Sequence, residues 1–275
     1  MLIVDSQVHI WNLGTPNPWH RQISSYSVND LIGEMDETGI NRAIIVPPMW
    51  MGDTNVLALE AARAFPDRLA VLGRLDINKP VATSVFENWN KQSGMLGLRF
   101  TFSTEKEYLL LTDGSLEWLW YEAEKFQIPV MLMVSGHLQE VEKIINNYPD
   151  IKLCIDHLGL VRNAVDDAAF EDLSYLLSLS TNRNLVVKVT SLPCYSSKPY
   201  PYYELHPYIR QIYDSFGPSR MFWGSDLTRL TSSYRECLTL ITEELRWLSE
   251  NDKKLILGVA ICNWLGWEAK EENIL

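Results

Sequence analysis

The feature that most constrains this chain is a regular alternation of short apolar runs with longer segments of helical periodicity. The runs are rich in Val, Ile and Leu, which is typical of strands that are buried on both faces of a parallel sheet. Parallel neighbours need a crossover connection, so strands that alternate with helices predict repeated βα units. Eight such runs occur, at residues 2–9, 42–47, 69–75, 96–102, 129–134, 152–157, 185–190 and 221–226.

The segments between these runs carry the periodicity of amphipathic helices. They include residues 28–38, 54–65, 116–126, 138–147, 170–179 and 234–248. Ser27 and Asn29 are suited to cap the first of these helices, and Gly39 follows it where a left-handed residue commonly ends a helix. The Pro-rich segment 198–207 predicts a long loop after the seventh strand, which would serve as a lid or specificity element.

Eight βα units predict an α/β protein of the (β/α)8 barrel class, with a single domain over residues 1–275. The alternative is a doubly wound open sheet, which usually has a glycine-rich phosphate-binding turn after its first strand. Residues 11–18 contain no such turn, and no Gly/Ser-rich linker or block of charges divides the chain. The sequence therefore favours the closed barrel.

Composition and charge exclude several functional classes. The chain has 24 basic and 35 acidic residues, and its net charge of -11 would repel a nucleic-acid backbone. No stretch approaches the roughly 20 apolar residues that span a bilayer, and no signal-peptide pattern opens the chain, so we expect a cytoplasmic protein with no membrane partner. The four cysteines have no C-x-x-C spacing, which argues against a disulfide framework or a cysteine zinc site.

Polar residues interrupt the apolar runs near their C-terminal ends, where the active sites of (β/α)8 barrels lie. Because side chains alternate across a strand, residues two apart point to the same side and can face the barrel interior together. By the same rule Asp156, which precedes His157, is expected to point to the opposite face and to be structural. The polar residues are Asp5, Gln7, His9, Arg99, Thr101, His157, Lys188, Thr190 and Asp226.

Three motifs carry a resemblance to a known family: VDSQVHIW at 4–11, IDHLG at 155–159 and WGSDLTR at 223–229. They resemble the first-, sixth- and eighth-strand motifs of the amidohydrolase-2 family, a lactonase-like branch of the amidohydrolase superfamily. The motifs follow the same order along the chain, and a fourth-strand arginine, Arg99, adds to the match. The resemblance implies a TIM-barrel hydrolase.

The resemblance also implies a mechanism. Asp226 would act as general base on a water, while His157 and His9, helped by the amide of Gln7, would hold and polarise the carbonyl oxygen of a lactone or related ester. For Asp226 to do so it must be ionised near neutral pH, and an adjacent imidazolium or Arg99 would favour that state.

Several side chains are candidates for binding the substrate. Arg99 is suited to anchor a substrate carboxylate, because its guanidinium binds carboxylates through two hydrogen bonds; the alternative is a pair with an internal carboxylate such as Asp76. The other candidates for substrate contact are Gln7, Lys188, Trp11 and Tyr195. For His20, on a loop near the barrel mouth, substrate contact and plain surface exposure are equally plausible.

One position departs from the family pattern. Metal-dependent relatives have His-x-His at the end of the first strand, and here the first of these positions is Gln7. An amide oxygen is a weak ligand for Zn²⁺, which prefers imidazole, thiolate and carboxylate. The sequence therefore favours a reaction with no required cofactor. The alternative is a weakly held divalent metal, Zn or Mn, with His9, His157 and Asp226 as ligands.

Together these features predict a hydrolase that opens a small organic acid lactone, with a homo-oligomer as an open alternative to a monomer. Two other functions stay open. One is a nonoxidative decarboxylase of the same superfamily, which would need a well-held divalent metal. The other is a barrel without catalysis that binds a small molecule, an idea that the loss of a metal-type histidine at Gln7 keeps open.

Overall fold

Eight parallel strands form the centre of the computed structural model, which describes residues 1–268. They pair in chain order, from β1 next to β2 through to β8, whereas the strand order of a doubly wound sheet reverses at a switch point. The (β/α)8 barrel prediction is therefore confirmed. The predicted domain also included residues 269–275, which lie outside the described residues. The strands are β1 (Val4–Val8), β2 (Arg42–Ile45), β3 (Leu69–Gly73), β4 (Met95–Thr101), β5 (Val130–Met133), β6 (Leu153–Ile155), β7 (Leu185–Thr190) and β8 (Met221–Gly224).

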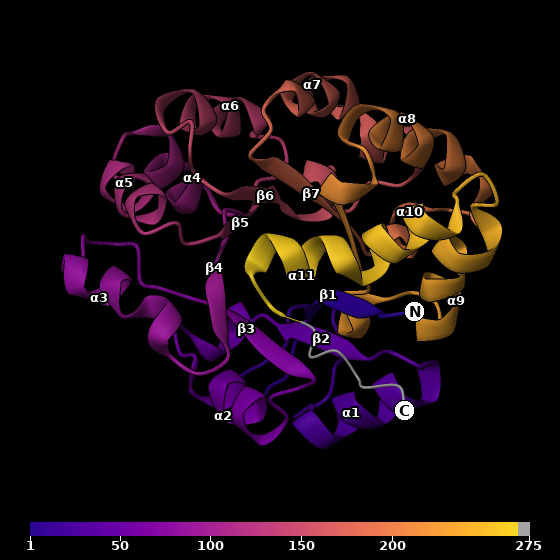
Figure 1. The fold of residues 1–275 in the computed structure, drawn as a ribbon, viewed down its shortest axis with the longest axis horizontal. Coiled ribbons are helices and arrows are strands. Elements are labelled where there is room, and N and C mark those ends of the chain that lie inside the picture. The colour runs from indigo at the N-terminus through magenta and orange to yellow at the C-terminus, as the bar shows by residue number, and fades with distance from the viewer. Residues whose placement is uncertain (269–275) are drawn as a thin grey trace.

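Helices surround this sheet, and Figure 1 shows them following the chain around the strands. Apolar stripes on the helices pack against the outward faces of the strands and form the larger hydrophobic core. No helix within residues 1–268 has the length and apolar character needed to cross a bilayer. The helices are α1 (Val28–Thr38), α2 (Val56–Ala64), α3 (Thr83–Glu87), α4 (Glu105–Thr112), α5 (Glu117–Lys125), α6 (Leu138–Asn147), α7 (Leu173–Ser178), α8 (His206–Phe216), α9 (Tyr234–Thr239), α10 (Glu250–Lys254) and α11 (Ala260–Leu265).

The first helix shows how local sequence sets an element's bounds. Ser27 caps α1 by accepting a hydrogen bond from the backbone N–H of Asp30, whose carboxylate accepts one from the backbone of Ser27 in return. Gly39 ends the helix with φ 82°, a left-handed conformation that glycine adopts without steric cost. Both features were predicted, but Asn29 lies inside the helix and does not cap it.

Other helices differ from the predicted segments. The segment 234–248, expected as one helix, is α9 followed by a π-helical turn over Leu240–Glu244. Within residues 1–268, five helices lie outside the predicted segments: α3, α4, α8, α10 and α11. Helix α8 begins at His206, so the last two residues of the segment 198–207, expected as a loop, lie in its first turn. The missing N–H of Pro207 costs no hydrogen bond there.

The barrel closes where the end of β8 meets β1. The backbone N–H of Asp226 donates to the carbonyl oxygen of Gln7 at 3.0 Å. Below it the buried carboxylate of Asp5 accepts hydrogen bonds from the Ser225 backbone N–H at 2.9 Å and from the Tyr234 hydroxyl at 2.7 Å. Burial raises the pKa of Asp5, and these donors offset part of that effect. Asp5 thus fixes the first strand against the end of β8.

Opposite the C-terminal ends of the strands, an apolar layer seals the barrel. Inward-pointing Leu72, Met131, Val186 and Phe222 pack with residues of α11, among them Ile261. In Figure 1 this helix, in yellow, lies across the centre of the strands. Because this end is filled and covered, polar groups inside the barrel are reached from the opposite end.

Gly224 is the glycine on which closure depends. A Cβ atom at this position would lie 2.5 Å from Ser6 Oγ and 2.7 Å from a methyl group of Thr190, so β8 could not approach its neighbours. We expect Gly224→Ala to lower the free energy of unfolding by about 1–3 kcal/mol, measured by urea denaturation. The control is Gly33→Ala, on the exposed face of α1 with no atom within 4 Å, which should stabilise by about 0.5–1 kcal/mol. Equal effects of the two changes would contradict this account.

Candidate active site

A polar pocket opens at the C-terminal ends of the strands. The strand residues Gln7, Arg99 and Thr101 form its floor together with His157. Loops after β1, β2, β6 and β8 form its walls, whereas no residue of the segment 198–207, expected as a lid, lines it. The lining residues are Gln7, His9, Asn17, Trp19, His20, Pro47, Pro48, Met49, Trp50, Arg99, Thr101, Met133, His157, Arg162, Asp226 and Arg229.

Three consecutive strands, β6, β7 and β8, are followed by residues in the left-handed backbone conformation. His157 has φ 51°, Ser191 has φ 56° and Asp226 has φ 53°. This conformation costs a non-glycine residue on the order of 1–3 kcal/mol, so it persists only where the surrounding structure enforces it. Here the reversal turns the three side chains toward one another: Ser191 Oγ lies 3.3 Å from Asp226 Oδ2 and 3.4 Å from His157 Nδ1.

The orientation of Asp156 corrects a prediction from strand periodicity. Its carboxylate is buried inside the barrel, 2.8 Å from Arg99 Nε and 3.1 Å from Lys188 Nζ. It lies two residues after the inward-pointing Cys154, so alternation places Asp156 inside and would turn His157 outward. The left-handed turn at His157 brings that ring back to the pocket. Both residues therefore reach the interior.

The structure also shows which carboxylate pairs with Arg99, a point that the sequence left open. The partner is Asp156, and Asp76 lies near the surface, where it accepts from Asn78. Burial by itself raises the pKa of Asp156, but Lys188 and Arg99 lower it more, so the carboxyl group stays ionised. Lys188 is fully buried beneath the floor and does not line the pocket.

Lys188 fixes the hydrogen-bonding state of His157 through Gln7. Its ammonium can only donate, so Gln7 Oε1, 3.0 Å away, is the acceptor and the Gln7 NH2 group faces His157 Nε2 at 3.2 Å. His157 Nε2 must then accept, and its proton lies on Nδ1, 2.7 Å from Thr190 Oγ1. Burial lowers the pKa of His157 to about 3, so the ring is neutral at physiological pH.

His9 and Asp226 face each other across the pocket. His9 Nδ1 lies 2.7 Å from the carbonyl oxygen of Val46, which can only accept, so this nitrogen carries a proton. The other ring nitrogen, Nε2, lies 3.1 Å from Asp226 Oδ1. Burial alone would raise the pKa of Asp226, but its contact with His9 holds the pKa well below its usual range. Asp226 is therefore an ionised carboxylate within the pocket.

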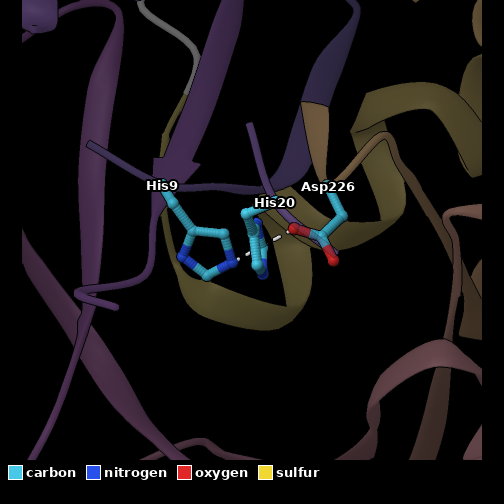
Figure 2. A group of neighbouring side chains, drawn as sticks. All are labelled: His9, His20 and Asp226. Atoms are coloured by element: carbon cyan, nitrogen blue, oxygen red, sulfur yellow. Dashed lines mark ion pairs between the residues drawn. The ribbon is translucent and has the colours of Figure 1, made fainter. Parts of the chain in front are cut away.

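A third side chain joins this pair from a loop. Figure 2 shows the ring of His20 beside His9 and Asp226, with the dashed line marking the ion pair between those two. His20 Nδ1 lies 2.9 Å from Thr228 Oγ1, and its ring packs against Trp50 at a centroid distance of 4.9 Å. Burial lowers the pKa of His20 to about 4, which keeps it neutral. Of the two possibilities left open for His20, the structure places it in the pocket wall.

These three residues fit a divalent metal better than the set expected from sequence. The ligand atoms of His9, His20 and Asp226 lie within 4.8 Å of one another. Asp226 Oδ1 is buried without an aligned hydrogen-bond donor, and the Nδ1 contact of His9 with a carbonyl is the kind that orients metal-binding histidines. His157, by contrast, has its Nε2 lone pair occupied by Gln7. The donor set of two imidazoles and a carboxylate is one that Zn²⁺ accepts.

Two arginines in the pocket were not singled out from the sequence. Arg162 follows β6 and Arg229 follows β8, three residues after Asp226 within the WGSDLTR motif. Arg229 could have been found from the sequence, because it closely follows a predicted strand end. Arg162 could not, because it lies in a loop whose path the sequence does not specify.

Trp11 and Tyr195, predicted to contact the substrate, lie behind the pocket wall. The indole N–H of Trp11 donates to the carbonyl oxygen of Ile23 at 3.1 Å, and its ring packs edge-on against Trp50. The Tyr195 ring lies under the guanidinium of Arg229 at 5.2 Å. Both side chains therefore support residues that line the pocket.

The sequence of this chain matches a known protein family. The amidohydrolase model of the amidohydrolase-2 family matches residues 4–259, nearly the whole chain. The chain belongs to the amidohydrolase-2 family. This membership confirms the resemblance seen in the strand motifs and the prediction of a hydrolase-type enzyme.

Individual relatives are more distant. The chain is 27% identical over 218 residues to 4-sulfomuconolactone hydrolase of Rhizobium radiobacter, an alignment that covers 72% of this chain and 65% of that protein. It is 21% identical over 232 residues to L-fucono-1,5-lactonase of Burkholderia ambifaria, covering 81% and 79% of the two chains. A crystal structure of a zinc-bound amidohydrolase from Burkholderia multivorans has the same fold, with a TM-score of 0.81, 20% identity and coverage of 97% and 99%.

A substitution at Lys188 tests the charge network beneath the pocket. Removing its ammonium leaves Gln7 Oε1 without this donor and Asp156 with Arg99 as its remaining cationic partner. We expect Lys188→Met to lower the free energy of unfolding by about 3 kcal/mol, measured by urea denaturation. Lys143→Met, which removes an exposed pair with Glu140, should change it by less than about 0.5 kcal/mol. A Lys188 variant as stable as the Lys143 control would refute the structural role.

Proposed function

We propose that this protein hydrolyses a small carboxylated lactone, with Asp226 as the general base that activates water. The observation that carries the proposal is an ionised carboxylate, held between His9 and Ser191, in a pocket that also contains Arg99, Arg162 and Arg229. Opening a lactone requires a base for the attacking water and positive charge near the carbonyl oxygen, which becomes an oxyanion. Both requirements are met by residues of one pocket.

Asp226 is oriented for this role by its neighbours. Its Oδ2 accepts from Ser191 Oγ, while its Oδ1 faces His9 and has no aligned hydrogen-bond donor among the described residues. That oxygen is the one we propose to hold the water and take its proton. The His9 ring is fixed by its contact with the Val46 carbonyl, and it then holds the carboxylate in position relative to the water.

The roles of His157 and Arg99 follow from their contacts. His157 Nε2 accepts from Gln7, so in this arrangement we propose that His157 shapes the floor and supports Ser191 rather than donating to the substrate. Arg99 uses Nε for Asp156, and its terminal nitrogens contact Thr101 Oγ1 and Met133 Sδ. We propose that the N–H groups left over bind the carboxylate or the carbonyl oxygen of the substrate.

The relatives support this class of reaction. The two curated proteins reported above are named as lactone hydrolases, and they match this chain over most of its length. A zinc ion is bound in the similar structure from Burkholderia multivorans. If this chain holds a divalent ion, we propose His9, His20 and Asp226 as its ligands; such an ion acts as a Lewis acid and lowers the pKa of a bound water.

Acid release from a panel of lactones tests the proposed reaction, because each ring opened at neutral pH yields one proton. We expect turnover of at least one carboxylated lactone, and a loss of about 100-fold or more in kcat for Asp226→Asn, since the amide cannot take the proton. The measurement is a pH-indicator assay before and after treatment with a chelator.

Asp214→Asn is the matched control, because Asp214 is exposed on α8, where it pairs with Arg210. It should leave the rate unchanged. An unchanged rate in Asp226→Asn would remove the centre of the proposal. If no lactone is hydrolysed but carbon dioxide is released from aromatic acids, the decarboxylase is favoured. Ligand binding without any turnover would favour the non-catalytic barrel.

Metal binding tests, independently of activity, whether the third ligand beside His9 and Asp226 is His20 or His157. We expect Zn²⁺, titrated into chelator-treated protein by calorimetry, to bind at one equivalent per chain, and His20→Ala to weaken binding by about tenfold or more. His206→Ala should have no effect, because this ring lies outside the pocket against the carbonyl oxygen of Pro201. Loss of binding in His157→Ala but not in His20→Ala would instead support the set of His9, His157 and Asp226.

A further inference from the structure

The loop between β1 and α1 is fastened to the rest of the protein at its base and at its tip. At the base, the backbones of Trp11 and Tyr26 exchange two hydrogen bonds of 2.9 Å. Nearer the tip, Arg21 Nη2 donates to Glu34 Oε2 of α1 at 2.9 Å. At the tip, the backbone N–H of Arg21 donates to the carbonyl oxygen of Thr228 at 2.8 Å. These contacts fix the path of the loop over the pocket.

The ring of His20 could still turn about its own bonds within this fixed loop. It packs against Trp50, with ring centroids 4.9 Å apart, and edge-on to His9 at 5.2 Å. A flip of an imidazole ring by 180° keeps the ring in the same plane but exchanges a nitrogen for a carbon on each edge. Packing of this kind therefore fixes the plane of the ring, and a hydrogen bond is needed to decide which nitrogen faces the pocket.

The hydroxyl of Thr228 supplies that hydrogen bond. Thr228 Oγ1 lies 2.9 Å from His20 Nδ1, and the threonine is 2% exposed. A buried hydroxyl keeps its partner because bulk water cannot replace it. With Nδ1 engaged, Nε2 is the ring nitrogen left for a ligand. Thr228 does not line the pocket, and it lies two residues after Asp226, so one short segment carries both the proposed base and this anchor.

The ring of His9 is held in the same manner. Its Nδ1 lies 2.7 Å from the carbonyl oxygen of Val46, which leaves Nε2 on the side of Asp226, 3.1 Å from Oδ1. Histidines that bind metals are commonly oriented in this way, because one ring nitrogen donates its proton to an oxygen of the chain and the other keeps its lone pair. A hydroxyl oxygen can accept such a proton as a carbonyl oxygen does. The two imidazoles of the candidate metal set therefore share one arrangement.

We propose that Thr228 is a positioning residue, whose hydroxyl accepts the Nδ1 proton of His20 and leaves the Nε2 lone pair for a ligand shared with His9 and Asp226. This inference rests on the proposed function only in naming a divalent ion as that ligand. In this scheme Thr228 acts through His20 and contacts neither substrate nor ion. The position of the ring proton and the affinity for the ion are two separate consequences, and each can be measured.

Nitrogen NMR of the histidine rings tests the first consequence in metal-free protein. The chain has five histidines, so the signals of His20 are identified by their loss in His20→Ala. At neutral pH we expect the proton on Nδ1 in the wild type and in Thr228→Ser, which keeps the hydroxyl. In Thr228→Val the Nδ1 proton loses its acceptor, so it should be shared between the two nitrogens. A proton on Nε2 in the wild type, or an unchanged ring in Thr228→Val, would overturn the inference.

Zinc affinity, measured by calorimetry, tests the second consequence without any turnover. Thr228→Val should weaken Zn²⁺ binding by about tenfold or more, and Thr228→Ser should stay within about threefold of the wild type. Thr239→Val is the matched control, because Thr239 is also buried but its hydroxyl donates to the carbonyl oxygen of Arg235 on α9, outside the pocket. It should change neither the ring proton nor the affinity.

The outcomes separate this inference from the proposed function. Unchanged affinity in Thr228→Val, or equal losses in Thr228→Val and Thr228→Ser, would overturn the role of the hydroxyl. If the wild type binds no Zn²⁺, the candidate metal set is wrong, and the ring proton in the metal-free protein still decides the role of Thr228. A failed lactone assay changes neither readout.

Discussion

The buried carboxylate of Asp156 organises the interior of this barrel. It is surrounded by the guanidinium of Arg99 and the ammonium of Lys188, which keep it ionised where burial would otherwise favour the neutral form. Because Lys188 is held there, its remaining donor capacity orients Gln7, and Gln7 in turn decides which nitrogen of His157 carries the proton. A charge pair beneath the pocket thus determines the hydrogen-bonding character of a ring at its floor.

Water activation and substrate recognition use different parts of the scaffold. The proposed base, Asp226, is anchored by the barrel itself through its backbone bond to Gln7 and its contact with Ser191. Arg162 and Arg229 of the pocket wall lie on loops, where a change of residue leaves the strand ladder intact. This division is typical of (β/α)8 barrels, in which strand ends provide chemistry and loops choose the substrate.

The replacement of a metal-type histidine by Gln7 has more than one consequence. The amide is a weak metal ligand, and it also engages the lone pair of His157 that a metal would need. The loop histidine His20 lies beside His9 and Asp226. The compact set of metal-type ligands in this chain is therefore composed differently from the strand-end set that the family resemblance suggested.

Much of the fold was readable from local patterns. Apolar runs marked all eight strands, because strands covered on both faces must be apolar along their length, and the capping residue Ser27 marked the start of α1. The period of two also placed Gln7 and His9 together in the pocket, where the structure has them. Counting the same period back from His157 misplaced Asp156, because β6 ends at Ile155 and the left-handed turn at His157 breaks the alternation.

The sequence by itself determined the order of strands and helices and the polar residues at the strand ends, because both depend on short-range periodicity. Only the tertiary structure decided which charges pair, which nitrogen of His157 is protonated, and that His20 and Arg162 reach the pocket. Those outcomes depend on distances between segments that lie far apart in the chain and on the paths of loops. No local pattern specifies such distances, since closure of the barrel and packing of the loops set them together.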